Sequence, residues 1–145
     1  MEIVFKTIGV IHSPFKKIEE IPCQGYKSNK EGKVEIFKEY NKALTDIDGF
    51  SHIYLLYYFH KHSGFRQMVK PFLDEKKHGL SATRHFNRPN PLGISIVELL
   101  ERNENILLVK QIDVLDGTPI LDIKPYVPIF DQRKNIKIGW LEGKI

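Results

Sequence analysis

The sequence predicts a mainly β fold, either a small barrel or a sandwich, with about six to seven strands and one short helix. Short runs rich in β-branched and aromatic residues recur along the 145-residue chain. Turn signals such as Asp116-Gly117 separate these runs. A regular alternation of strand and helix patterns is absent, which argues against a doubly wound sheet. The length is usual for one domain, so we expect residues 1–145 to form a single domain.

The strands are expected, in chain order, at residues 3–11, 32–37, 50–59, 94–101, 106–114, 120–123 and 136–141. The run 50–59 is almost wholly apolar, so we expect this strand to be buried on both faces. Short extended pieces are expected at residues 67–69, 80–83 and 127–131. The helix is expected at residues 40–47, with Asn41 as its cap.

Composition excludes several classes of protein. The single cysteine, Cys23, allows no intrachain disulfide and suits a reducing compartment. The longest apolar run, residues 53–59, is far shorter than the roughly 20 residues that span a bilayer. The N-terminus lacks the basic region and long apolar core of a signal peptide. We therefore expect a cytoplasmic protein without membrane contact. The net charge of +4 weakly favours a polyanionic partner such as RNA.

The stretch ATRHFNRPNPLGIS, residues 82–95, predicts a rigid loop that leads into a strand. Pro89 and Pro91 fix their own backbone and bias the preceding residues toward extended conformations. Gly93 permits a close approach or an unusual φ. The loop should therefore hold three polar side chains at fixed positions, Arg84, Arg88 and Asn90. Arginine forks suit carboxylates and phosphates, and the alternative is a stiff structural turn with solvated arginines.

A second stretch, DGTPILDIKPY at residues 116–126, begins with a turn and continues as a strand. Asp122, Lys124 and Tyr126 are spaced two apart, so on an extended chain they point to the same side. A carboxylate, an ammonium and a phenol on one face suit acid–base chemistry or the binding of an anion. The alternative is an exposed Asp–Lys pair with little energetic weight.

Histidines and the cysteine indicate no metal centre. His52, His60 and His62 lie at spacings that favour one face of a strand, and three imidazoles could bind zinc. No acidic or thiol ligand stands at a telling spacing, so strand-end histidines that pack or form hydrogen bonds are the favoured interpretation. Cys23 is favoured as a small apolar residue over a nucleophile. The glycine-rich Rossmann and Walker motifs are absent from the sequence.

Several segments together resemble one known family. They are residues 8–15, 22–24, 49–56 with His60, 82–93 and 116–126. The RPNPLG and DGTPILDIKPY motifs within them are specific, and the two in one chain are improbable by chance. The chain resembles the TsaA-like family, which includes S-adenosyl-L-methionine-dependent tRNA N6-adenine methyltransferases. The resemblance extends from Ile8 to Asp131.

The resemblance implies a small closed or partly closed β-barrel that binds S-adenosyl-L-methionine and works as a homodimer. It implies methylation of N6 of threonylcarbamoyladenosine, next to the anticodon of tRNA. By matching motifs, cofactor contacts fall on Pro22, Cys23, Gln24, His60, Lys61, Arg84, Ile94, Asp116, Gly117, Thr118 and Pro119. Cys23 stands where the family has a basic residue. Some members carry a further C-terminal domain, and where it contributes to tRNA binding we expect substrate choice to differ.

For the catalytic side we hypothesise that Asp122 or Tyr126 accepts the N6 proton, with Lys124 tuning the acceptor or binding the threonyl carboxylate. Arg88 and Asn90 would orient the base or that carboxylate. The anticodon loop of tRNA would bind through Lys and Arg side chains and through stacking on aromatic rings. The alternative function is a non-catalytic sensor that binds S-adenosylmethionine or another nucleotide.

Overall fold

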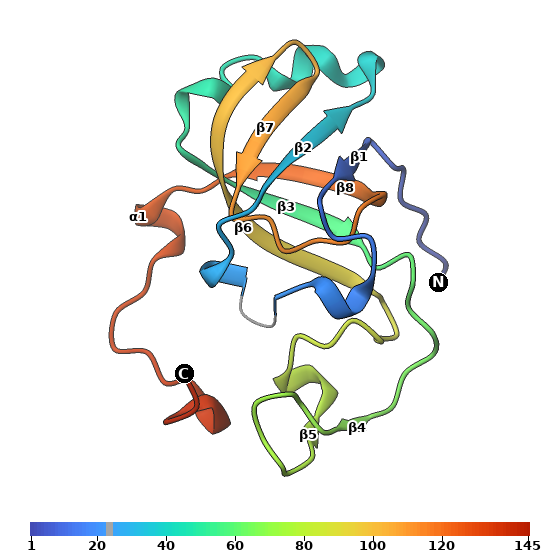
Figure 1. The fold of residues 1–145 in the computed structure, drawn as a ribbon, viewed down its shortest axis with the longest axis vertical. Coiled ribbons are helices and arrows are strands. Elements are labelled where there is room, and N and C mark those ends of the chain that lie inside the picture. Colours follow the sequence, from blue (N-terminus) through green and yellow to red (C-terminus); the bar gives the residue numbers. More distant parts are fainter. Residues whose placement is uncertain (23–24) are drawn as a thin grey trace.

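The computed structural model describes residues 1–22 and 25–145. Antiparallel strands close into a barrel, and a separate two-stranded sheet lies outside it (Figure 1). In barrel order the strands are β1 (Gly9–His12), β2 (Glu31–Ile36), β7 (Ile106–Lys110), β6 (Leu92–Asn103), β3 (His52–Tyr58) and β8 (Thr118–Pro125). The mainly β prediction is confirmed, and the structure selects the barrel over the sandwich.

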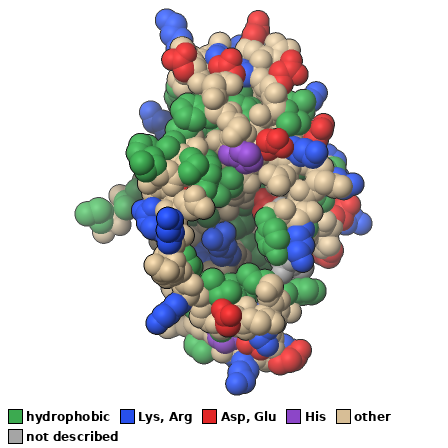
Figure 2. Space-filling view, turned by 90° about the vertical axis from the view of Figure 1, so that its left-hand side faces the viewer, with side chains coloured by type: hydrophobic (Ala, Val, Ile, Leu, Met, Phe, Trp, Pro, Cys, Tyr) green, Lys and Arg blue, Asp and Glu red, His purple; other side chains and the backbone are tan. Residues whose placement is uncertain are grey.

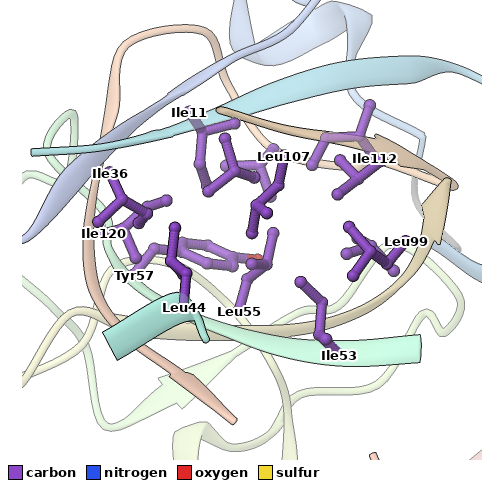
Figure 3. Packing of buried hydrophobic residues seen from close by; sticks show 14 of the residues in the cluster. Ile11, Ile36, Leu44, Ile53, Leu55, Tyr57, Leu99, Leu107, Ile112 and Ile120 are labelled. Atoms are coloured by element: carbon purple, nitrogen blue, oxygen red, sulfur yellow. The ribbon is translucent and has the colours of Figure 1, made fainter. Parts of the chain in front are cut away.

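The barrel interior holds the hydrophobic core (Figure 3). Strand β3 shows the pattern, because Ile53, Leu55 and Tyr57 point inward and are buried while their neighbours are only half-buried. The prediction that this strand is buried on both faces was wrong. A closed barrel made of few strands covers only its inner face, so apolar residues at alternate positions remain on the outside.

Strand β8 contains a bulge that decides which of its side chains face outward. Ile120 pairs with Tyr57 and is buried, whereas Asp122 pairs with Leu56 on the outer face. Leu121 is the extra residue between these two pairs. Because side chains alternate along a strand, a strand without this bulge would point Asp122 and Lys124 into the core.

Residues 60–91, which we call the outer segment, leave the barrel after β3 and return to it at β6. They contain β4 (Met68–Val69), which pairs with β5 (His78–Gly79), and the 3-10 helix η5 (Leu80–Ala82). The outer segment lies below the barrel in Figure 1. The expected strand at 67–69 is confirmed, whereas the extended piece expected at 80–83 is a 3-10 turn, in which Thr83 N–H donates to Leu80 O.

The helix prediction was wrong in type and cap. Residues 38–44 form the 3-10 helix η3 (Lys38–Leu44), which is preceded by Phe37 as its cap residue, not by Asn41. The one α-helix in the described part of the chain is α1 (Pro128–Asp131), where an extended piece was expected. Proline at the first helical position favours the helix, and Asp131 accepts the Val127 N–H at 2.9 Å. The other 3-10 helices are η1 (Ile18–Glu20), η2 (Gly25–Lys27), η4 (Ile47–Gly49) and η6 (Gly139–Leu141).

Both ends of the chain differ from the expected strands. The N-terminal strand covers only Gly9–His12, and residues 136–141 form no strand. Barrel closure supplies the reason for the second difference, since each barrel strand already has two neighbours and offers no free edge for another strand. Within the residues that the structure describes, no helix is both long and apolar enough to cross a membrane.

Candidate functional site

One end of the barrel gathers most of the loops that the sequence singled out. Strand β3 runs antiparallel to β6 and β8, with Tyr58 opposite Leu92 and Tyr57 opposite Ile120. Strand β1 likewise ends beside the start of β8. The ends of β1 and β3 and the starts of β6 and β8 therefore form one rim, at the right of the barrel in Figure 1. We call it the loop rim.

Four separate segments of the chain contribute predicted cofactor residues at the loop rim. His60 and Lys61 directly follow β3, and Arg84 lies in the loop that leads into β6. The turn before β8 and the first residues of that strand carry the group Asp116, Gly117, Thr118 and Pro119. Pro22 belongs to the connection between β1 and β2, while Cys23 and Gln24 lie outside the described residues. Ile94 lies on β6 with its side chain on the outer face and 47% exposed.

The turn before β8 is held by its own polar groups. Asp116 accepts the Ser13 N–H at 2.9 Å and pairs with Lys16 Nζ at 2.9 Å. The hydrogen bond from Lys16 lowers the pKa of the Asp116 carboxyl below its usual value. Gly117 has φ +82°, a conformation that glycine adopts without strain, and Thr118 Oγ1 donates to Leu115 O at 2.6 Å. Since the Asp116 side chain already has protein partners, it is mainly backbone that this turn presents.

Hydrogen bonds hold the loop before β6, and Arg88 is part of its framework. Arg88 Nη1 donates to Thr83 O and to His85 O, each at 3.0 Å. Arg84, between these two anchors, has an exposed side chain, and no hydrogen bond or ion pair is formed by it within the described residues. A Cβ on Gly93 would collide with the Tyr57 ring, so the expectation of a close approach is confirmed.

Sequence reasoning missed a polar chain beside Arg84. Tyr57 Oη lies 2.8 Å from Ser95 Oγ, and Ser95 Oγ donates to Asp113 Oδ1 at 2.6 Å. Burial raises the pKa of the Asp113 carboxyl, and the nearby Arg84 charge opposes this rise. Burial also raises the pKa of Tyr57. The signal in the sequence was the charged Asp113 between the apolar residues Ile112 and Val114.

Asp122 and Lys124 share the outer face of β8, and Tyr126 directly follows the strand on the same side, as their alternation predicted. Lys124 Nζ lies 3.1 Å from Asp122 Oδ2, and the Tyr126 ring contacts that of Tyr54, with 5.8 Å between centroids. They extend away from the loop rim, because six residues of strand place Lys124 roughly 20 Å from Thr118. The structure therefore brings His60, Lys61, Arg84 and the turn 116–119 to one rim but does not bring Lys124 or Tyr126 to them.

The histidines do not converge. His52 Nδ1 lies 2.9 Å from Ser51 Oγ, and His62 Nδ1 lies 2.7 Å from Phe59 O. Burial, with a smaller effect of the Lys61 charge, lowers the pKa of His60. In residues 1–22 and 25–145, no three side chains of the metal-binding types are grouped to hold an ion.

Concave regions lie on the surface near the loop rim and beside the outer segment. An open depression of about 400 Å³ beside Asp116 is lined on its other sides by residues that include His12, Lys16 and Lys33. Figure 2 shows a hollow between the barrel and the outer segment, on the side that carries α1 in Figure 1. Lys or Arg side chains lie inside this hollow and hydrophobic side chains border it.

The protein is thus a small closed antiparallel barrel whose loops gather at one rim and whose sequence has no glycine-rich nucleotide turn. The chain matches the family model described as the tRNA-methyltransferase O N-terminal domain over residues 10–132. The chain therefore belongs to this family, and the resemblance found in the sequence is confirmed.

Known relatives support the assignment. The chain is 51% identical over 144 residues to a probable S-adenosyl-L-methionine-binding protein of Pyrococcus abyssi, covering 99% of this chain and 78% of that protein. It is 38% identical over 150 residues to the tRNA (adenine(37)-N6)-methyltransferase of Escherichia coli, covering 96% of this chain and 64% of the relative. The crystal structure of TrmO from Pseudomonas aeruginosa has a TM-score of 0.82 at 34% identity, covering 97% of this chain and 63% of that one.

Proposed function

We propose that this chain is an S-adenosyl-L-methionine-dependent methyltransferase that modifies N6 of an adenosine next to the anticodon of tRNA. The finer proposal is that the accepting base is threonylcarbamoyladenosine. The observation that carries the proposal is the convergence of four connections at the loop rim, in a chain of the tRNA-methyltransferase O family. We also propose the cytoplasm as its compartment, because a tRNA substrate is met there.

The residues at the loop rim fit the cofactor. Arg84 offers a guanidinium without a protein partner in the described residues, and Asp113 offers a carboxylate whose Oδ1 alone is bonded. Opposite charges side by side suit the carboxylate and ammonium of an amino acid. His60, half-buried, and the backbone of the turn 116–119 would hold the rest of the molecule. When bound, S-adenosylmethionine supplies an electrophilic methyl group on a sulfonium.

The acceptor nitrogen needs a group that removes its proton. N6 of threonylcarbamoyladenosine is part of a urea, so its lone pair is poorly available until the proton is lost. Asp122 is the nearest of the three outer-face residues to the loop rim and would take this proton on a carboxylate oxygen. Lys124, which pairs with Asp122, would hold the threonyl carboxylate. Tyr126 would stack on the anticodon loop.

Arg88 has a supporting role within this proposal. Its Nη1 is committed to two loop carbonyls, so it would orient the base mainly by fixing the loop. The exposed Asn90, on the same loop, would contact the base directly.

Single-turnover methylation tests the roles on the acceptor side. We expect Asp122→Ala to slow transfer about 100-fold or more, since a general base contributes at least that factor. Lys124→Ala and Tyr126→Phe should slow it less, because they affect tRNA binding and orientation. Donor affinity, measured separately by calorimetry, should stay at the wild-type value in all three. Wild-type transfer rates in all three variants would exclude this assignment.

The outer face of β6 supports the further proposal of a homodimer. Four apolar side chains on or beside this face are 42–47% exposed, namely Leu92, Ile94, Ile96 and Leu100. Contiguous exposed apolar surface of this kind marks interaction sites. Only strand β3 separates this face from the row that carries Asp122 and Lys124, since Leu56 lies opposite both Ile94 and Asp122, so a second copy seated there would lie near the acceptor residues. Sedimentation should give a dimer for the wild type and a monomer for Ile96→Lys, and two equal masses would contradict the proposal.

A further inference from the structure

The last part of the chain, residues 132–145, reaches away from the barrel, and we call it the C-terminal arm. It follows α1 and ends beside the outer segment (Figure 1). The family model matches residues 10–132, so the arm lies almost entirely outside the matched range. Its residues are exposed except for Trp140 and Leu141, which are half-buried in and beside η6.

Trp140 makes the central contact of the arm. Its indole ring stacks on the His78 ring, with 4.5 Å between centroids and 16° between planes. Its Nε1–H donates to Ala82 O at 2.8 Å. The planar stack and the directed hydrogen bond together define one docked position of the arm. An apolar contact without such geometry would allow several positions.

A cluster of charged side chains adds a second link between the arm and the outer segment, next to the Trp140 contact. Lys144 Nζ lies 3.5 Å from Asp74 Oδ1, and Asp74 Oδ2 lies 2.7 Å from His78 Nε2. The Asp74 and His78 side chains are only 12% and 18% exposed, so this cluster is partly shielded from water. In the described residues, the hydrogen bonds and ion pairs that join positions 134–145 to the rest of the chain all go to the outer segment.

The outer segment needs such an anchor. Its regular structure is limited to the pairing of β4 with β5, two residues each, and one turn of η5. A two-stranded sheet of this size is not stable by itself in water. Ala82, the residue that Trp140 holds, stands two positions before Arg84. Arg88 holds the loop directly on both sides of Arg84, through Thr83 O and His85 O.

We propose that Trp140 is a positioning residue, and that docking of the C-terminal arm holds the outer segment where Arg84 serves the loop rim. Donor binding and arm docking are then coupled, and each must favour the other by the same factor. This inference rests on the proposed function only in its second part, the effect on the donor. The first part, arm docking that orders the outer segment, applies to the free protein.

Hydrogen exchange of the free protein tests the first part. Removing the indole in Trp140→Ala should speed exchange of the amides at 78–90 by about tenfold, with no change in β2 and β7, because local opening of a weakly held segment controls that exchange. Ile136→Ala, an exposed apolar change in the same arm, is the matched control and should leave exchange unchanged. Equal exchange at 78–90 in wild type and Trp140→Ala would overturn the proposal, whether or not the protein binds S-adenosylmethionine.

Calorimetry with S-adenosylmethionine tests the second part. Trp140→Ala should weaken its binding about five- to tenfold, the size of a typical coupling between sites. Trp140→Phe, which keeps a stacking ring but loses the N–H donor, should weaken it about threefold. The chain has a single tryptophan, so the change in its fluorescence on donor binding reports on this contact alone. Unchanged affinity in Trp140→Ala overturns the coupling, whereas a wild type that binds no donor overturns the proposed function.

Discussion

At the residue scale, Ser95 occupies the middle of a polar chain inside an apolar barrel. Its hydroxyl donates to Asp113 and so receives the hydrogen bond of Tyr57. Both neighbours are mostly buried, so each needs its partner there. This polar series ends at the Asp113 carboxylate, which lies near the Arg84 charge. It therefore links the core to the loop rim.

The hydrogen-bonded series Tyr57–Ser95–Asp113 predicts which substitution lowers the free energy of unfolding more. Ser95→Ala leaves two buried groups without a partner and should lower the free energy of unfolding by about 1–3 kcal/mol. Tyr57→Phe removes only one end of the chain and should lower it by about 1 kcal/mol. Urea unfolding measures both, with Ser81→Ala on the exposed part of η5 as the control. A larger loss for Tyr57→Phe than for Ser95→Ala would contradict the proposed direction of the hydrogen bonds.

The lowered pKa of Asp74 predicts that the free energy of unfolding depends on pH in the acidic range. The hydrogen bond from His78, followed by those from the Lys76 and Glu75 amides, lowers the pKa of this carboxyl from 3.8 to about 2. A depressed folded-state pKa stabilises the fold at pH above 3.8, and the contribution is lost as the pH falls toward about 2. The wild type should therefore exceed Asp74→Asn in free energy of unfolding at pH 5, and the difference should vanish near pH 2. A difference that is constant between these pH values would refute the assignment.

At the element scale, the bulge at Leu121 decides the chemistry of β8. Because the bulge takes up Leu121, deletion of that residue leaves a regular ladder in which Ile120 and Asp122 keep their partners Tyr57 and Leu56. Asp122 and Lys124 therefore stay on the outer face, and we expect the deletion variant to fold, with a lowered Tm, in circular dichroism. Leu121→Ala keeps the bulge and is the matched control. A deletion variant that is unfolded at 25 °C would show that the barrel requires the bulge itself.

Elements also show how far the sequence predicts the fold. Strand β2, with its alternating polar and apolar residues, and strand β7, a short apolar run between turn signals, lie within a few residues of their expected positions, because local patterns encode them. The strand expected at 3–11 is confirmed only from Gly9, where pairing with β2 and β8 begins, and the strand expected at 136–141 was wrong because the closed barrel has no free edge. The helix at 128–131 was missed because a proline that begins a short helix resembles one that ends a strand.

The candidate site was predicted in part for the same physical reasons. The alternation of Asp122, Lys124 and Tyr126 follows from the sequence, because it depends only on strand geometry. The use of Arg88 within its own loop and the chain from Tyr57 to Asp113 depend on contacts between distant segments. No local pattern encodes such contacts, so they required the structure.

At the scale of the whole molecule, a closed barrel provides the rigid frame and the connections provide the function. We propose that the loop rim holds the cofactor, that the outer face of β8 carries the acceptor residues, and that the C-terminal arm holds the outer segment in place. The chain covers 64% of the length of the Escherichia coli methyltransferase.

Transfer of a labelled methyl group from S-adenosylmethionine to tRNA tests the central proposal most directly. Two tRNA samples should be compared, one with threonylcarbamoyladenosine next to the anticodon and one with unmodified adenosine at that position. We expect label in the N6-methylated modified base of the first sample and none in the second. Donor binding without transfer to either tRNA would contradict the proposed methyltransferase and favour a sensor of S-adenosylmethionine.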